Sequence, residues 1–128
     1  MLSLAFNSKA QIDGDFDLPI LIAQHLSLES EGYWIEMLNR LSPLEVKEAD
    51  EKEPIIAGKV YIAPPNYHLL VEPDHTLSLC VHERVNYARP SIDVLFESAS
   101  HVYQQHLIGI LLTGANKDGA EGLKQIKE

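Results

Sequence analysis

The amino-acid sequence predicts a three-layer, doubly wound α/β fold, with a mainly parallel sheet and one antiparallel hairpin. Short apolar runs, typical of strands buried on both faces, alternate with segments whose apolar residues recur at helical spacing. Two further apolar runs flank a short polar turn, which is the pattern of a hairpin. The 128 residues predict one domain, long enough to bury a hydrophobic core without covalent staples.

The first part of the chain predicts one strand and one helix. Residues 1–19 are weakly patterned, and their Gly and Asp residues favour a loop that Pro19 ends. Residues 20–23 form an apolar run that predicts a buried strand. A helix capped by Ser27 or Ser30 follows and stops at Pro43. Its apolar face is predicted from Tyr33, Trp34, Met37, Leu38 and Leu41.

The middle of the chain is rich in predicted strands. Residues 44–46 are a brief candidate, and residues 60–63 form a second one. Residues 68–72 and 76–81 then flank a polar turn at 73–75, so we expect an antiparallel hairpin there. That turn contains no glycine, and its type is therefore left open.

The last part of the chain predicts a helix, a strand and a second helix. Pro90 suits a first helical turn, and the polar groups of Ser91 and Asp93 suit a cap. Residues 107–112 predict a buried strand, and Asp118 begins the final helix. The apolar stripe of the first of these helices consists of Ile92, Leu95, Phe96, Ala99, Val102 and Tyr103.

Composition excludes several classes of protein. Ten basic and nineteen acidic residues give a net charge of −9, which would repel a nucleic-acid backbone, so we expect no nucleic-acid partner. The single cysteine, Cys80, rules out an internal disulfide framework and a Cys-rich zinc module. The sequence has no long apolar stretch and no signal-peptide pattern, so we expect a cytoplasmic protein that is not embedded in a membrane.

Two polar segments follow predicted strands. In parallel sheets, active sites lie at the carboxyl ends of the strands. His25 comes after the strand at 20–23 and could act as a general base. Asp118 comes after the strand at 107–112 and could hold the imidazole of His25 in one tautomer. Gly114 lies in the loop just before Asp118, where backbone N–H groups could face an oxyanion.

From the residues alone, simpler interpretations stay open. A histidine at the end of a strand is commonly structural, and an aspartate at a helix start commonly serves as the N-cap. The Gly-rich segment at 113–119 also fits an ordinary turn.

The chain resembles the catalytic domain of the chemotaxis protein-glutamate methylesterase family. Four motifs occur in the family's order, which makes the resemblance specific. They are PILIAQHL at 19–26, GKVYIAPP at 58–65 with HLL at 68–70, RPSIDVLF at 89–96 with SA at 98–99, and LLTGANKDGA at 111–120.

The resemblance implies an esterase that hydrolyses methyl esters of receptor glutamates, and in some members deamidates glutamines, through a serine–histidine–aspartate triad. By motif, His25 is the triad histidine and Asp118 the triad aspartate. The family's oxyanion donor, usually a methionine N–H after Thr-Gly, corresponds to Ala115, beside Gly114. The implied partners are methyl-accepting chemotaxis receptors. A receiver domain could act in trans, because none fits in this chain, and no cofactor is expected.

The triad serine has no counterpart in the sequence. The family carries it in a Gly-Ala-Ser-x-Gly-Gly loop after a first strand, and neither Ser3 nor Ser8 is flanked by those glycines. Residues 1–128 therefore match a partial catalytic domain that lacks the nucleophile-bearing first strand and a C-terminal strand and helix, and we expect an exposed sheet edge and little or no activity. The alternative is an inactive receptor-binding or regulatory module with the same fold.

Three histidines recur at seven-residue spacing, at His68, His75 and His82. A hairpin would scatter them, and no His-Glu-x-x-His or Cys-x-x-Cys pattern is present, so we expect no metal site. His68 is interpreted as a surface residue at a strand start, although the cleft is an alternative place for it.

Overall fold

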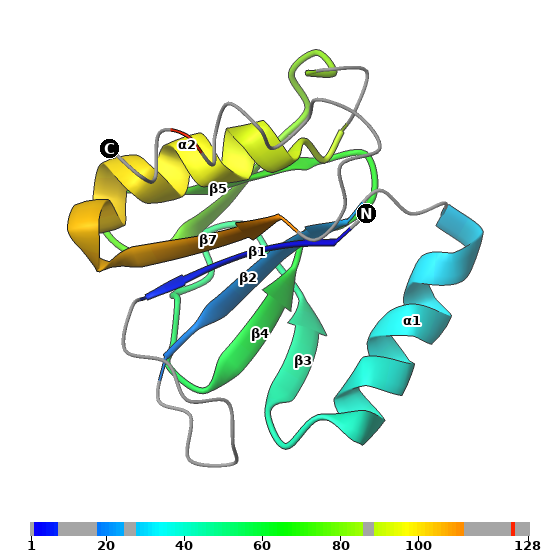
Figure 1. Ribbon diagram of the computed structural model, residues 1–128. Helices are drawn as coiled ribbons and strands as arrows, with labels where there is room; N and C mark the ends of the chain where they lie inside the picture. The colour runs from blue at the N-terminus through cyan, green and yellow to red at the C-terminus, as the bar shows by residue number, and fades with distance from the viewer. Residues whose placement is uncertain (1, 8–17, 25–27, 86–88, 112–123, 125–128) are drawn as a thin grey trace.

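The computed structural model describes residues 2–7, 18–24, 28–85, 89–111 and 124, with the side chains of 2–7, 28–34, 105 and 108–111 left aside. The elements alternate as expected for an α/β protein (Figure 1). They are β1 (Leu2–Asn7), β2 (Ile20–Gln24), α1 (Leu28–Leu41), β3 (Glu45–Glu48), β4 (Lys59–Ile62), β5 (His68–Val71), β6 (Leu77–Cys80), α2 (Ile92–Tyr103), the 3-10 turn η1 (Gln104–His106) and β7 (Leu107–Leu111).

The main sheet has five strands in the order β3-β4-β2-β1-β7. β2 and β3 each pair in parallel with β4, whereas β1 pairs antiparallel with both β2 and β7. It follows that β2, β3, β4 and β7 all run in one direction and that β1 alone opposes them. The predicted class, a mainly parallel α/β sheet with a separate antiparallel hairpin, is confirmed.

The strand β1 corrects the expectation that the start of the chain carries little pattern. Leu2–Asn7 fills the place between β2 and β7, so β2 is paired on both sides by described strands. The exposed edge that we expected beside β2 is therefore absent from the part of the chain that the structure describes. Leu2, Leu4 and Phe6 alternate with smaller residues, which is a period-two signal for a strand.

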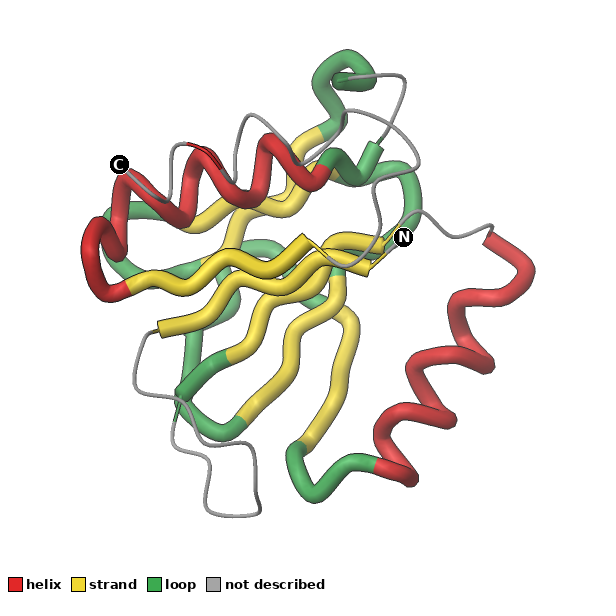
Figure 2. Tube along the Cα trace, in the orientation of Figure 1, coloured by secondary structure: helices red, strands yellow, loops and turns green. Residues whose placement is uncertain are grey.

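Alternating residues of the central strands divide the core into two clusters, one on each face of the sheet. On one face, Ile20 and Ile22 of β2 meet Ile62 of β4 and the partly buried Ile35 and Leu38 of α1. On the other face, Leu21 and Tyr61 lie in the cluster that includes Phe96 of α2 and Leu77 of the hairpin. Figure 2 shows the resulting layers, with one helix on each side of the sheet.

The helices differ in detail from the sequence prediction. Ile92, Leu95, Phe96 and Ala99 of α2 are fully buried, as the apolar stripe predicts. Leu41, expected on the core face of α1, is instead 76% exposed, and it is the last residue of that helix. Tyr33 and Trp34, also assigned to that face, lie outside the described side chains.

The start of α2 corrects the position of Pro90. Ser91 is the N-cap, and its side chain accepts a hydrogen bond from the amide of Val94 at 3.4 Å. Pro90 therefore precedes the cap rather than opening the first turn, and its bond to Arg89 is cis.

The hairpin of β5 and β6 is confirmed, and its turn is now defined. The amide of His75 donates to the carbonyl of Glu72 at 2.9 Å, and His75 has a left-handed φ of 63°. This combination is a type I turn followed by a left-handed residue, a common three-residue hairpin connection. Asp74 supports it by accepting hydrogen bonds from both the hydroxyl and the amide of Thr76. No helix in the described residues is long and apolar enough to cross a membrane.

Candidate functional site

Two strands, with one strand between them, end at the edge of the sheet where the sequence predicts the chemistry. Gln24, the last residue of β2, is paired with Leu2, and Leu111, the last residue of β7, is paired with Ser3. Because β1 is antiparallel to both, β2 and β7 run parallel and finish at the same edge. One strand separates them, so their ends are about 10 Å apart.

All four predicted site residues lie outside the described part of the chain. His25 is the first residue after β2, and Gly114, Ala115 and Asp118 follow β7 by three to seven positions. The contact between His25 and Asp118 therefore stays a prediction. The segments that contain His25 and Asp118 follow β2 and β7, which end at the same edge of the sheet. The prediction requires this arrangement.

The N-terminus of α2 lies at this same edge. Only the short turn η1 separates α2 from β7, so the helix runs back along the sheet and begins where β7 ends (Figure 1). α2 packs on β1, β2 and β7. The first turn of α2 therefore stands close to the two strand ends that precede His25 and the Gly114 loop.

His68 is a buried residue at the beginning of β5, only 2% exposed, and the expectation of a surface histidine is wrong. Its Nδ1 accepts a hydrogen bond from the amide of Ser91 at 3.1 Å. Its Nε2 lies 2.8 Å from the carbonyl oxygen of Glu83. Because an amide can only donate and a carbonyl can only accept, the ring proton sits on Nε2. The imidazole thus joins the hairpin, the segment after β6 and the cap of α2.

Arg89 makes a second set of contacts at the start of α2. Its Nη1 donates to the carbonyl oxygens of Val81 and His82, at 3.1 and 3.2 Å. Its Nε is buried and has no hydrogen-bond partner in the described structure. The guanidinium therefore holds the segment that leaves β6 against the approach to the helix.

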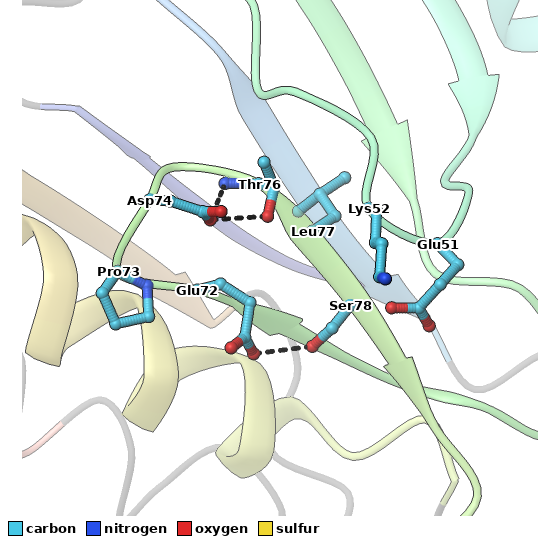
Figure 3. A pocket seen from close by; sticks show the side chains of 8 residues that line it. All are labelled: Glu51, Lys52, Glu72, Pro73, Asp74, Thr76, Leu77 and Ser78. Carbon is cyan, nitrogen blue, oxygen red and sulfur yellow. Dashed lines mark hydrogen bonds between the residues drawn. The ribbon is translucent and has the colours of Figure 1, made fainter.

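A pocket of about 610 Å³ lies at the opposite end of the hairpin, around its turn (Figure 3). The ring of His75 in this turn packs edge-on against Tyr103, which ends α2, so the pocket is remote from the helix N-terminus. The Thr76 hydroxyl holds the pKa of Asp74 below its ordinary value. The pocket is lined by Glu51, Lys52, Glu72, Pro73, Asp74, Thr76, Leu77 and Ser78. None of these is a predicted site residue.

The evenly spaced histidines have separate surroundings. Both ring nitrogens of His68 are engaged within the protein, His75 packs on Tyr103, and His82 is exposed. Within the described residues, no group of three His, Cys, Asp or Glu side chains is placed to hold a metal ion. Cys80 is a half-buried free thiol whose sulfur accepts from the amide of His82.

Comparison with protein families matches residues 9–128 to the CheB methylesterase family, and the match includes all four predicted site residues. The chain belongs to the CheB methylesterase family. A protein from Leptospira interrogans, named putative protein-glutamate methylesterase/protein-glutamine glutaminase, is 59% identical over 113 residues, which are 88% of this chain and 58% of that protein. A Caulobacter vibrioides protein-glutamate methylesterase/protein-glutamine glutaminase 2 is 38% identical over 117 residues, which are 88% of this chain and 34% of that protein.

A solved structure shares the fold of this CheB-family chain. The crystal structure of the Thermotoga maritima CheB methylesterase catalytic domain matches with a TM-score of 0.86 and 31% identity, over 91% of this chain and 64% of that one. The chain thus spans about three fifths of the Leptospira relative and of the solved domain. His68 and Ser91 lie within the residues matched to the CheB family, whereas β1 lies before them.

Proposed function

We propose that this CheB-family chain carries the histidine and aspartate half of a protein-glutamate methylesterase site. In this proposal His25 is the general base, Asp118 fixes its tautomer, and backbone N–H groups at Gly114 and Ala115 face the oxyanion. The observation that carries it is the parallel course of β2 and β7, which flank β1 and end at the same edge of the sheet just before these residues. The family match over residues 9–128 supports the same assignment.

The substrate that we propose is a glutamate methyl ester on a chemotaxis receptor. In a site completed by a serine, the imidazole of His25 would take the proton of the attacking hydroxyl and return it to the methoxide, which leaves as methanol. The same imidazole would then deprotonate a water that releases the glutamate from the serine. Deamidation of a glutamine side chain would follow the same steps, with ammonia as the leaving group. The names of the Leptospira and Caulobacter relatives, which give both activities, support this substrate class.

We further propose that these 128 residues are inactive, or nearly so, by themselves. The sequence contains no Gly-Ala-Ser-x-Gly-Gly loop to present a nucleophile. Loss of the nucleophile from a triad that acts as a unit removes roughly six orders of magnitude of turnover. A receiver domain acting in trans belongs to the same proposal.

Methanol release from methylated receptor tests this proposal. We expect no release above background from the purified chain, and turnover equal to that of an intact family enzyme would contradict it. If release is measurable, the variants His25→Ala and Asp118→Asn must abolish it. Ser3→Ala then tests the serine that the register of β1 places between Ala23 and Leu111, with Ser8→Ala as the matched control.

The second candidate function is an inactive module that binds receptors, favoured by the missing serine loop. It predicts that the chain binds methylated receptor without releasing methanol, and that His25→Ala leaves the binding constant unchanged. The first proposal differs from this one because it requires His25 and Asp118 to interact with one another, whether or not a serine is present.

A further inference from the structure

His68 stands out among the buried groups because it is a polar side chain enclosed in the apolar face between the hairpin and α2. Together with Ser91 it is one of two polar residues buried to this extent in the described structure. Burial of an imidazole without hydrogen bonds costs free energy. Here both ring nitrogens have a backbone partner, an amide that can only donate and a carbonyl that can only accept. The imidazole therefore links two backbone groups that are distant in the sequence, at Ser91 and Glu83.

We propose that His68 is a positioning residue for the sheet edge at which β2 and β7 end, where the site is proposed. It acts as a neutral imidazole with its proton on Nε2. One nitrogen fixes the amide of Ser91, which caps α2, and the other fixes the carbonyl of Glu83 in the segment after β6. The imidazole therefore sets where the first turn of α2 stands relative to the ends of β2 and β7. That consequence for the site rests on the proposed function, whereas the tautomer and the two bonds do not.

Three features of the structure support this role over simple filling of space. The bond between His68 and Ser91 joins residues 23 positions apart and involves two buried residues. The cap that it holds also makes a bond of its own to Val94. The side chain of Arg89, two residues before Ser91, ties the same helix start to Val81 and His82. The start of α2 is thus held from two sides at the edge where the site is proposed.

The two bonds can be separated by substitution. His68→Asn keeps an acceptor near the place of Nδ1, so it retains the bond from Ser91 and loses the one to Glu83. His68→Gln keeps a donor near the place of Nε2, so it does the reverse. His68→Phe keeps the shape and loses both. His82→Asn, at an exposed histidine, is the matched control.

The first measurement is made on the whole chain by NMR. Ring ¹⁵N signals of His68 must show an unprotonated Nδ1 and a protonated Nε2 at neutral pH. Amide hydrogen exchange at Ser91 is expected to be about tenfold faster in His68→Phe and His68→Gln, and close to wild type in His68→Asn and His82→Asn. A proton on Nδ1, or equal exchange at Ser91 in all variants, overturns the proposal. Should His68→Phe fail to fold, the Asn and Gln pair decides.

The second measurement separates a positioning role from a structural one. The pH midpoint of the His25 ring titration is sensitive to the position of the groups around His25. This midpoint should change in His68→Gln and should stay at the wild-type value in His68→Asn. An unchanged midpoint in His68→Gln, in a chain whose Ser91 exchange has risen, contradicts the positioning role. A midpoint that does not respond to Asp118→Asn in the wild-type background contradicts the proposed function instead, and leaves the tautomer and its bonds standing.

Discussion

Gln24 and Leu111 end two strands that run in the same direction, with a single opposed strand between them. Residues far apart in the sequence thereby leave the sheet about 10 Å apart, at one edge. Histidine follows one of these strand ends directly, and the Gly114 loop and Asp118 follow the other. The proposed meeting of His25 and Asp118 requires this relationship between the two strands.

Tyr61 is expected to be a strong stability determinant through its hydroxyl. The residue is fully buried, and its oxygen accepts from the amide of Ile56 and donates to the carbonyl of Pro54. Tyr61→Phe would leave two backbone groups without a partner, which should lower the free energy of unfolding by about 1–2 kcal/mol. Urea denaturation measures this loss. The control Tyr67→Phe, at an exposed tyrosine, should change stability by less than about 0.5 kcal/mol, and equal effects would contradict the assignment.

The cap of α2 provides a second prediction. Ser91→Ala removes the oxygen that accepts from Val94, so the free energy of unfolding should fall by about 1 kcal/mol. Ser100→Ala removes an exposed hydroxyl that donates back to the carbonyl of Glu97 within the helix, and it should be nearly neutral. Denaturant midpoints of the two variants give the comparison. A loss no larger at Ser91 than at Ser100 would argue against a capping role.

The ion pair of Lys47 predicts a pH dependence of stability. The hydrogen bond to Glu53, with a smaller one to Asp50, raises the pKa of Lys47 above its ordinary 10.5. A raised lysine pKa stabilises the folded state below pH 10.5, and this contribution disappears as the pH rises through the folded-state pKa.

Lys47→Met should therefore be destabilising at pH 7, by less than about 1 kcal/mol, because the lysine is partly solvated. The difference from wild type should shrink as unfolding is measured at increasing pH above 10.5. Lys59→Met, which removes a more exposed pair with Glu45, is the control. A difference that stays constant to high pH would show that the lysine acts through its apolar stem instead.

Much of the fold could be predicted from local patterns because its central strands are apolar on both faces. Residues 20–23 and 60–63 are continuous apolar runs. In the structure, the odd-numbered side chains of both runs lie in one core cluster and the even-numbered side chains in the other. The stripe of α2 follows the same logic, since four of its residues are fully buried. Binary pattern and period are sufficient for such elements.

The features that escaped prediction depend on distant parts of the chain. In the sequence, His68 looks like a surface residue because it stands at the start of a strand just after the segment 64–66. Only the approach of residues 83 and 91 buries it. The strand β1 carries a detectable alternation of Leu2, Leu4 and Phe6, but the loop-forming residues after it dominate that region. The type of the hairpin turn could not be predicted because histidine, not glycine, takes the left-handed position at residue 75.

The central claim, that His25 and Asp118 interact at the common edge of β2 and β7, is tested most directly by NMR titration of the His25 ring. A neighbouring carboxylate favours the imidazolium, so Asp118→Asn should lower the titration midpoint of His25. Asp93→Asn, which removes a carboxylate from the first turn of α2, serves as the comparison. The account predicts a clear fall of the midpoint in Asp118→Asn that exceeds any change in Asp93→Asn, and an identical midpoint in wild type and Asp118→Asn would contradict it.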